Sequence, residues 1–403
     1  MITLKHDTLS FTFPEIARQV RVLVERRIQE IASELPPTWD RADLWAEIES
    51  DQNFAKLSPT ALEGARERLH TWTRAHVEGS LREFASNLGG LNTDSFAALT
   101  IKFQRAMRIP NDGETYALPT ALGQLPLRSI DDFPETAPAS FMKKGGIVMP
   151  LHRSEALWIW FSSRYRFAVK IGAGEINALS GEPWNSELGR QPQNYLVAPG
   201  PPWGENDEVL RRYVTMPLTT GDSADGPRAD WADSGVIQFQ VVPMRAESYY
   251  RDEVYLPPTI KEFFMRLIFA PIISAQLAEQ RRRHAQWDLE DPFEKSVEPA
   301  LEVATRQEIL EDEYEFTAWD QAQTVRCFAQ PCDSSLWRQI TGSNPPLLPL
   351  TAKDYEEAGI PWLDDYRHDG KPLPENSSIT PDRIVQSRNA RQTVEIREFP
   401  NAS

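Results

Sequence analysis

Four polar side chains that could perform acid–base or nucleophilic chemistry lie together in the run His152-Arg153-Ser154-Glu155. A serine, a histidine and a carboxylate are groups that enzymes use for proton transfer and covalent catalysis. However, neighbouring residues of a strand point to opposite faces, so these four side chains cannot all converge on one point. The Gly-x-Ser-x-Gly turn that presents a nucleophilic serine is absent as well. The run is therefore more typical of turn and edge residues than of a catalytic centre.

A catalytic hypothesis still has definite candidates. If the chain has an active site, we expect it near His152, Glu155 and Lys170, and the protein would then be a hydrolase-type enzyme. The sequence leaves the question of catalysis open and leans against it.

Binding of nucleotides, metals or other cofactors is poorly supported. The run Gly172-Ala-Gly174 lacks the third glycine of a dinucleotide fingerprint and no helical pattern follows it, so it indicates a hairpin. The six histidines are scattered, and no pair has a ligand spacing beside a third ligand. The two cysteines, Cys327 and Cys332, are expected to be buried thiols. We therefore expect no metal and no cofactor.

Tryptophan is the most unusual feature of the composition, with 12 residues. Most of them are expected in the core, but Trp184 and Trp203 lie beside proline and glycine in predicted loops. These two and Trp362 are candidate binding residues, because aromatic side chains on a β scaffold bind sugars and peptides and dominate protein interfaces.

Short strands are the elements that must position these residues. Residues 2–13 have the alternating pattern of one half-buried strand. From residue 98 onward, short apolar runs separated by glycine and proline predict an antiparallel, sandwich-like β core. The expected strands include 146–151, 156–161, 167–171, 195–198, 213–218 and 236–244.

Helical spacing interrupts the β pattern. Residues 15–97 contain apolar side chains at intervals of three and four, with a proline stop and a Ser-Pro start between successive helices. We therefore predict an α+β protein: a β-rich core formed by 1–14 and 98–366, with a helical insertion at 15–97. A helix within 256–290, kinked at Pro271, is expected to belong to the core domain. Residues 367–403 are expected to form a flexible polar tail.

The charge balance restricts the possible partners. The formal net charge of −16 repels phosphate backbones and anionic membrane surfaces, so nucleic-acid binding is not expected. The start of the sequence lacks the features of a signal peptide, and its most apolar stretch is too short to span a bilayer. These features predict a cytoplasmic protein.

Five blocks of this sequence stand out: FQRAMRIPNDGETYALP (103–119), GGIVMPLHRSEALW (145–158), FAVKIGAGEINALSGEPW (167–184), WRQITG (337–342) and TAKDYEEAGIPW (351–362). These blocks resemble a family of uncharacterised bacterial cytoplasmic proteins. Together they span the region expected to form the core, and the resemblance covers about half of the chain. It implies a shared fold unit and no particular activity.

Two departures from that family are informative. In the family, the first strand leads within a few residues to the block near Leu99, so the resemblance implies that 15–97 are an insertion. The family tends to be glycine-rich near 296–306, where this sequence is not. If those glycines shape a ligand loop, the resemblance implies that the loop is altered here.

Three functional hypotheses follow from these patterns. The favoured one is a non-catalytic interaction or assembly protein that binds a protein partner, or a second copy of itself, through the helical insertion and exposed aromatic residues. The alternatives are the hydrolase described above and a carbohydrate or small-ligand binding module.

Overall fold

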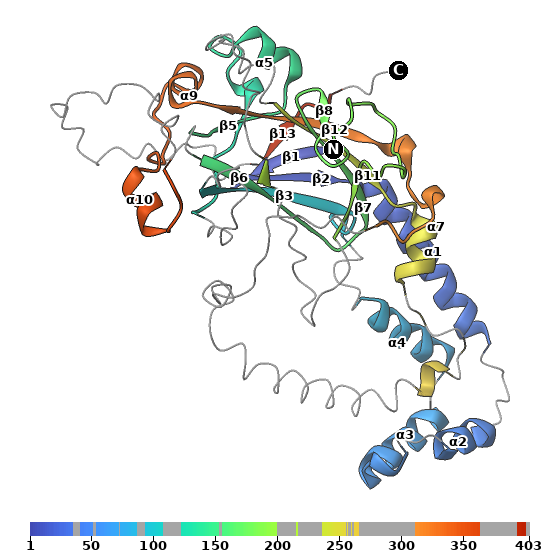
Figure 1. Cartoon of the computed structure of the whole chain (residues 1–403). Helices are drawn as coiled ribbons and strands as arrows, with labels where there is room; N and C mark the ends of the chain where they lie inside the picture. Colours follow the sequence, from blue (N-terminus) through green and yellow to red (C-terminus); the bar gives the residue numbers. More distant parts are fainter. Residues whose placement is uncertain are drawn as a thin grey trace. The chain divides into compact units, whose positions relative to one another are not determined.

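The computed structural model divides the chain into two compact units that are each built from separate segments. The β-rich unit contains residues 1–13, 97–245 and 302–403, and the helical unit contains residues 14–96 and 246–301. Strands and helices in these segments confirm the predicted α+β class (Figure 1). The structure describes residues 1–34, 41–50, 54–71, 73–86, 93–107, 122–152, 155–199, 215–216, 236–254, 256, 259, 262–265, 311–362 and 393–399.

The first sheet of the β-rich unit has six strands in the order β10-β6-β3-β2-β1-β13, and all neighbouring pairs are antiparallel. The strands are β1 (Ile2–Lys5), β2 (Thr8–Thr12), β3 (Ala98–Met107), β6 (Glu155–Ser163), β10 (Thr215–Met216) and β13 (Val394–Ile396). Leu99, Ile101 and Phe103 of β3 are buried, because alternate side chains of a strand share one face.

The first two strands form a hairpin, whereas the sequence pattern predicted a single strand over residues 2–13. The turn consists of His6 and Asp7, whose φ angles are 48° and 55°. Two consecutive left-handed residues match the right-handed twist of the flanking strands, and Asp tolerates this conformation better than most residues. The prediction was wrong because neither position carries the glycine that usually marks such a turn.

The second sheet has the order β4-β5-β12-β11-β7-β8, with β9 also paired to β7. Its strands are β4 (Arg128–Ser129), β5 (Ile147–Pro150), β7 (Phe167–Ala173), β8 (Ile176–Asn177), β9 (Leu196–Ala198), β11 (Ile237–Pro243) and β12 (Val325–Cys332). The pair β5–β12 is parallel, so the expectation of a purely antiparallel core was wrong for this pair. A long connection separates the two strands in sequence, and only such a connection permits parallel pairing.

The inner faces of the two sheets pack through aromatic side chains. The rings of Phe103 in β3 and Phe161 in β6 lie 5.8 and 6.5 Å from the ring of Phe239 in β11, both edge to face. Edge-to-face pairs of this kind add to the apolar burial that holds two sheets together. The core of the β-rich unit is therefore sandwich-like, as predicted.

Short helices also belong to the β-rich unit. They are η2 (Ile130–Asp132), α5 (Ala139–Lys144), η3 (Phe316–Ala318), η4 (Gln321–Gln323), α9 (Ser334–Thr341) and α10 (Ala352–Glu357). Helix α9 starts where the Asp333 carboxylate accepts a hydrogen bond from the Leu336 amide at 2.8 Å, and it ends at Gly342, which is left-handed. Its buried face, Trp337 and Ile340, packs against η2, α5 and β5.

The helical unit contains α1 (Pro14–Ser33), α2 (Arg41–Ser50), η1 (Phe54–Lys56), α3 (Pro59–Thr71), α4 (Arg74–Ser86) and α7 (Ala246–Glu253). Helix α1 buries one stripe at helical spacing, formed by Ile16, Val20, Val24, Ile28 and Ile31. It packs against α4 and α7. Within the described ranges, each helix is too short or too polar to cross a lipid bilayer.

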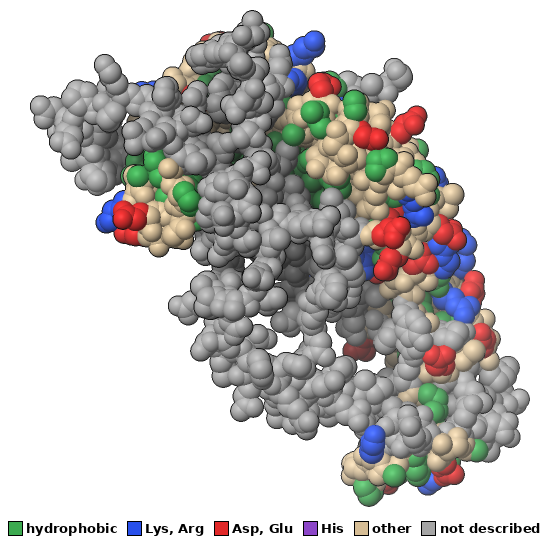
Figure 2. Space-filling model, viewed as in Figure 1, with side chains coloured by type: hydrophobic (Ala, Val, Ile, Leu, Met, Phe, Trp, Pro, Cys, Tyr) green, Lys and Arg blue, Asp and Glu red, His purple; other side chains and the backbone are tan. Residues whose placement is uncertain are grey.

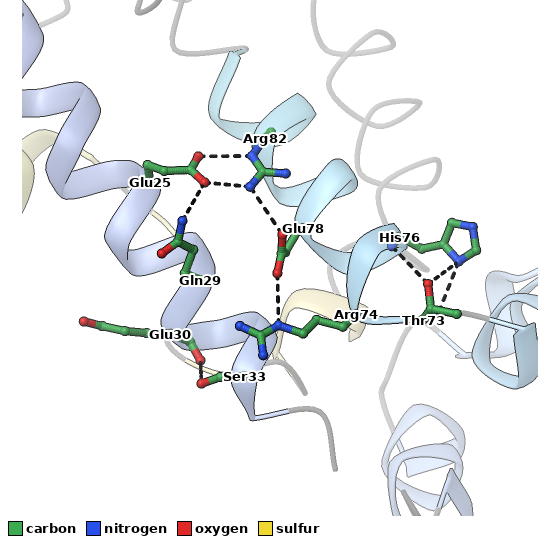
Figure 3. Close-up of polar contacts among 9 residues, drawn as sticks. All are labelled: Glu25, Gln29, Glu30, Ser33, Thr73, Arg74, His76, Glu78 and Arg82. Atoms are coloured by element: carbon green, nitrogen blue, oxygen red, sulfur yellow. Dashed lines mark hydrogen bonds and ion pairs between the residues drawn. The ribbon is translucent and has the colours of Figure 1, made fainter. Parts of the chain in front are cut away.

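Ion pairs fix α4 against α1 (Figure 3). Arg82 of α4 donates hydrogen bonds to both carboxylate oxygens of Glu25 in α1, at 2.6 and 3.1 Å, and a further one to Glu78. Arg74, one turn before Glu78, donates to the other oxygen of Glu78 at 3.0 Å. The two-point contact of a guanidinium with a carboxylate has a defined geometry, so it sets the register between the helices.

The helical segment 14–96 is inserted between two strands that pair with each other. Thr12 at the end of β2 lies opposite Ala98 at the start of β3, and the amide of Phe13 donates a hydrogen bond to the carbonyl of Ala97 at 2.9 Å. The chain therefore leaves and re-enters the sheet at neighbouring points, as an insertion requires.

Two further expectations about the organisation differ from the structure. The end of the expected tail, residues 393–399, is ordered in the β-rich unit, because β13 pairs with β1 and the Phe399 ring packs 4.8 Å from Phe328. The kink at Pro271 and most of the helix expected within 256–290 lie outside the described residues. The described residues at the start of that range, 256, 259 and 262–265, group with the helical unit and not with the β-rich core to which 256–290 was assigned.

Candidate functional site

The structure does not bring the three sequence-predicted catalytic residues together. Glu155 is the first residue of β6 and His152 lies three residues before it, with its amide 3.5 Å from Glu155 Oε2. Lys170 lies on β7 in the other sheet, and its hydrogen-bond partners are Asn185 and Glu187. A single site formed by all three residues was therefore a wrong expectation.

Glu155 is held in a buried ion pair with Arg105. On β3 and β6, Arg105 faces Leu157 and Met107 faces Glu155, so the two charged residues are diagonal neighbours on the inner face. Arg105 Nη2 donates to Glu155 Oε1 at 2.5 Å and also to the carbonyl of Leu348, and the two side chains are only 8% and 1% exposed. This carboxylate is therefore bound to a structural cation, and it is not positioned as a free general base.

His152 contacts a serine that the sequence analysis did not single out. Ser334 Oγ, at the first position of α9, lies 3.1 Å from His152 Nδ1. His152 Nε2 is buried and has no hydrogen-bond partner among the described residues. The Asp333-Ser334 run is visible in the sequence as a helix start, but its closeness to His152 depends on the parallel pairing of β5 with β12.

A row of three buried polar residues crosses the second sheet. Lys170 of β7 and Arg326 of β12 both lie directly opposite Gln240 of β11, and all three side chains are buried. Their side chains alternate with Phe239, so they point away from the inter-sheet core. We call Lys170, Gln240 and Arg326 the polar row.

One short segment, residues 184–187, contacts every member of the polar row. Lys170 Nζ donates to Asn185 Oδ1 at 2.7 Å and to the carbonyl of Glu187 at 2.5 Å. Gln240 Nε2 donates to the carbonyl of Ser186 at 2.8 Å.

Trp184 supplies the remaining contacts of this segment. Its indole ring centre lies 5.1 Å from Lys170 Nζ and 5.9 Å from Arg326 Cζ. Both distances fit attraction between a cation and an aromatic face. A Cβ atom on Gly172 would come within 2.6 Å of the Trp184 ring and of Gln238, so only glycine permits this approach. Trp184, expected to be exposed, is half-buried over the row.

Burial disfavours the protonated, charged forms of Lys170 and Arg326. It lowers the pKa of Lys170 to about 8, assisted by the nearby positive charge of Arg326 and opposed by Glu187 and Glu182. Burial also lowers the pKa of Arg326, opposed by Glu175. Within the described structure, no carboxylate forms an ion pair with either cation.

The structure describes one of the other two candidate tryptophans, Trp362. Trp203 lies outside the described residues. Trp362 is half-buried, and its ring lies 5.2 Å from that of Tyr355, in a small apolar cluster with Met107 and Ile360. Its contacts are those of a packing residue.

Asp312 forms a buried centre that sequence reasoning missed. Its Oδ2 accepts hydrogen bonds from Tyr195 Oη at 2.5 Å, Trp319 Nε1 at 2.9 Å and Arg190 Nη2 at 3.1 Å. Burial and the bond to Asp312 raise the pKa of Tyr195 to about 12. The three donors lie outside the named strands and helices, and Asp312 joins their segments through one buried carboxylate, so the centre has the character of a structural clamp.

Neither cysteine is an accessible nucleophile. Both thiols are free and buried, which confirms the sequence prediction. Burial raises the pKa of Cys327 to about 12 and that of Cys332 further still. In the part of the chain that the structure describes, no group of three or more His, Cys, Asp or Glu side chains could hold a metal ion.

Comparison of this chain with models of known protein families, with curated proteins and with solved structures found no match. The resemblance to a bacterial protein family that the sequence blocks suggest therefore stays a prediction.

Proposed function

We propose that this protein is a non-catalytic interaction or assembly protein, and that its helical unit binds a protein partner. The observation that carries the proposal is the place of the insertion. Thr12 and Ala98 are paired across β2 and β3, so the sheet would be continuous with a two-residue turn in place of the 83 residues between Phe13 and Ala97. The sheet has no need of the helices to set its register, which favours a separate role for them.

The internal structure of the helical unit supports this role. Arg82 joins α1 to α4 through Glu25, and α7 packs on α1, so the exposed surfaces of these helices are held in a fixed arrangement. Pre-ordered surfaces bind partners with less loss of conformational entropy than flexible ones. Figure 2 shows acidic and basic side chains interspersed over the described part of this unit, a pattern common on polar rims of interfaces.

An exposed apolar side chain marks the outer face of α1. Val22 is 48% exposed, and Arg18 and Arg26 lie one turn before and after it. Arginine is enriched at protein interfaces, and here two arginines flank an apolar side chain that is open to solvent. We therefore place the centre of the proposed contact at Val22.

The state of the catalytic candidates also supports a non-catalytic role. Glu155 is paired with Arg105, and Lys170 is covered by residues 184–187. Both groups would have to break a structural contact before they could act on a substrate.

The test compares two matched variants of the tagged full-length protein. Val22→Glu places a charge at the proposed contact, and Leu348→Glu makes the same change at an 84% exposed site of the β-rich unit. Affinity purification from the native cell should recover a stoichiometric partner with the wild type and with Leu348→Glu, and lose it with Val22→Glu. Equal recovery by both variants, or no partner with the wild type, would refute the proposal.

A second candidate function, hydrolysis, is favoured by one observation. Ser334 Oγ and His152 Nδ1 are in hydrogen-bond contact, so the serine has a potential base beside it. In this case the wild type should react with a fluorophosphonate probe and Ser334→Ala should not. A wild-type protein that stays unlabelled counts against hydrolysis by this pair.

A further inference from the structure

The polar row combines two buried cations with an incomplete set of partners, and this arrangement points to a ligand. We propose that Lys170, Gln240 and Arg326 form a binding site for a small oxyanion, a carboxylate or phosphate group. We further propose that Trp184 covers these residues when the oxyanion is absent.

The charge of the row is the first argument. Lys170 and Arg326 are buried in a chain whose formal net charge is −16, yet their hydrogen-bond partners in the described structure are neutral oxygens. A buried cation is normally paired with an anion, because removal from water is costly without a counter-charge. An oxyanion between the two side chains would supply that counter-charge.

Unused hydrogen-bonding atoms give the second argument. Arg326 Nη2 donates to Gln238 Oε1 at 3.0 Å, but Arg326 Nε is buried and has no partner among the described residues. Gln240 Oε1 is also buried and has no hydrogen-bond partner among the described residues. The arginine donor fits an oxyanion, and the glutamine acceptor fits a hydroxyl group on the same ligand.

The cover gives the third argument. Residues 184–187 provide the indole over Lys170 and Arg326, both hydrogen-bond partners of Lys170, and the carbonyl that accepts from Gln240. Movement of this one segment would therefore expose Lys170 and Gln240 and remove the indole from Arg326, whose Cζ also lies 5.2 Å from the ring centre of Phe399. A charge-assisted hydrogen bond to an oxyanion is stronger than a cation–aromatic contact, so a suitable anion can replace the indole.

The first test measures binding of inorganic phosphate and of acetate to the full-length protein by calorimetry at constant ionic strength. We expect saturable binding of at least one anion by the wild type and by Lys102→Met, a control on the other sheet, and a loss of at least tenfold in Lys170→Met. Binding of phosphate alone, or of acetate alone, identifies the group that the site prefers. No saturable binding by the wild type, or equal binding by Lys170→Met, overturns the proposal.

Trp184→Ala tests the role of the cover. Without the indole, the anion no longer competes with the cation–aromatic contacts, so binding should become about fivefold to tenfold tighter. Unchanged or weaker binding by a folded Trp184→Ala protein would contradict the proposed role of Trp184 as a cover.

Lys170→Arg keeps the test decisive if Lys170→Met does not fold. Arginine stays charged at high pH, whereas wild-type Lys170 loses its proton above about pH 8 in the setting of Arg326, Glu182 and Glu187. Anion affinity should therefore fall above pH 8 in the wild type and persist in Lys170→Arg. The same pH dependence in both proteins would contradict a direct contact between Lys170 and the anion.

Discussion

His152 and Ser334 each lie two residues beyond a matched pair of the parallel strands β5 and β12, Pro150 and Cys332. Parallel strands run in the same direction, so the segments that follow them leave the sheet side by side. Residues at equal distances beyond the matched pair therefore come close together. The 3.1 Å contact between Ser334 Oγ and His152 Nδ1 is a direct result of this register. Sequence separation hides the relationship, because 181 residues lie between the two positions.

Breaking the buried ion pair should destabilise the protein strongly. Arg105→Met leaves the Glu155 carboxylate buried without its cation, and should lower the free energy of unfolding by about 3–5 kcal/mol in urea denaturation. The double variant Arg105→Met/Glu155→Met should recover most of this loss. Lys353→Met, which breaks an exposed pair with Glu357, is the control and should cost about 0.5 kcal/mol or less. A double variant as unstable as the single one would contradict this account.

Removing the negative charge of Asp312 should affect both stability and the titration of Tyr195. In Asp312→Asn, the charged acceptor for Tyr195, Trp319 and Arg190 is lost, and unfolding should become easier by about 2–4 kcal/mol. The pKa of Tyr195 should fall from about 12, because the neighbouring charge no longer opposes ionisation. Ultraviolet absorbance during a pH titration measures this change, with Tyr195→Phe identifying the signal. No change in the titration would contradict the assignment.

A methyl group at residue 172 should be costly. The Cβ of Gly172→Ala would approach the Trp184 ring and the Gln238 side chain to 2.6 Å, so the cover over the polar row must shift. We expect a loss of about 1–3 kcal/mol in the free energy of unfolding. Gly79→Ala in α4, where nothing lies within 4 Å, should instead stabilise the protein by up to about 1 kcal/mol. Equal effects of the two substitutions would contradict the close packing at Gly172.

The lowered pKa of Lys170 predicts the sign of a pH effect. The folded protein releases the proton of Lys170 near pH 8, whereas an unfolded lysine keeps it until about pH 10.4. Between these values the unfolded chain binds more protons, so stability rises with pH. Relative to Lys170→Met, wild-type stability should therefore increase from pH 8 upward and level off near pH 10. If chemical denaturation shows the same difference in the free energy of unfolding between the two proteins at every pH, burial does not disfavour the charged form of Lys170.

Replacement of residues 14–96 by Asn-Gly should leave the β-rich unit folded. The new turn joins Phe13 to Ala97, which are already hydrogen-bonded across β2 and β3. Tyr249 of α7 packs on Phe96 and should be changed to Ser in the same variant, because the deletion removes that contact. We expect a cooperative thermal unfolding transition and a β-type circular dichroism spectrum. A variant that is unfolded would mean that the sheet depends on the inserted helices.

The sequence predicts local features of this fold better than its long-range pairings. The alternation of Leu99, Ile101 and Phe103 and the helical spacing along α1 depend on neighbours within a few residues. The parallel pairing of β5 with β12 and the return of β13 to β1 join distant segments, and no local pattern specifies them. The same limit explains why the expected flexible tail was wrong for residues 393–399.

The candidate site shows the same division. Lys170 and Trp184 were singled out from residue type, but their shared row with Gln240 and Arg326 requires the register of three strands. Ser334 and Asp312 were missed because a serine at a helix start and a lone aspartate are common in sequences without any special role. Only the fold shows which serine contacts a histidine and which aspartate accepts hydrogen bonds from three donors.

The pairing of β1 with β13 has a consequence for biosynthesis. Residues 2–5 leave the ribosome almost 400 residues before their partner strand at 394–396 is made. Throughout that interval β1 is an open sheet edge, with unpaired backbone groups that other chains can pair with. Nascent chains of this protein should therefore need protection by chaperones until β13 has emerged.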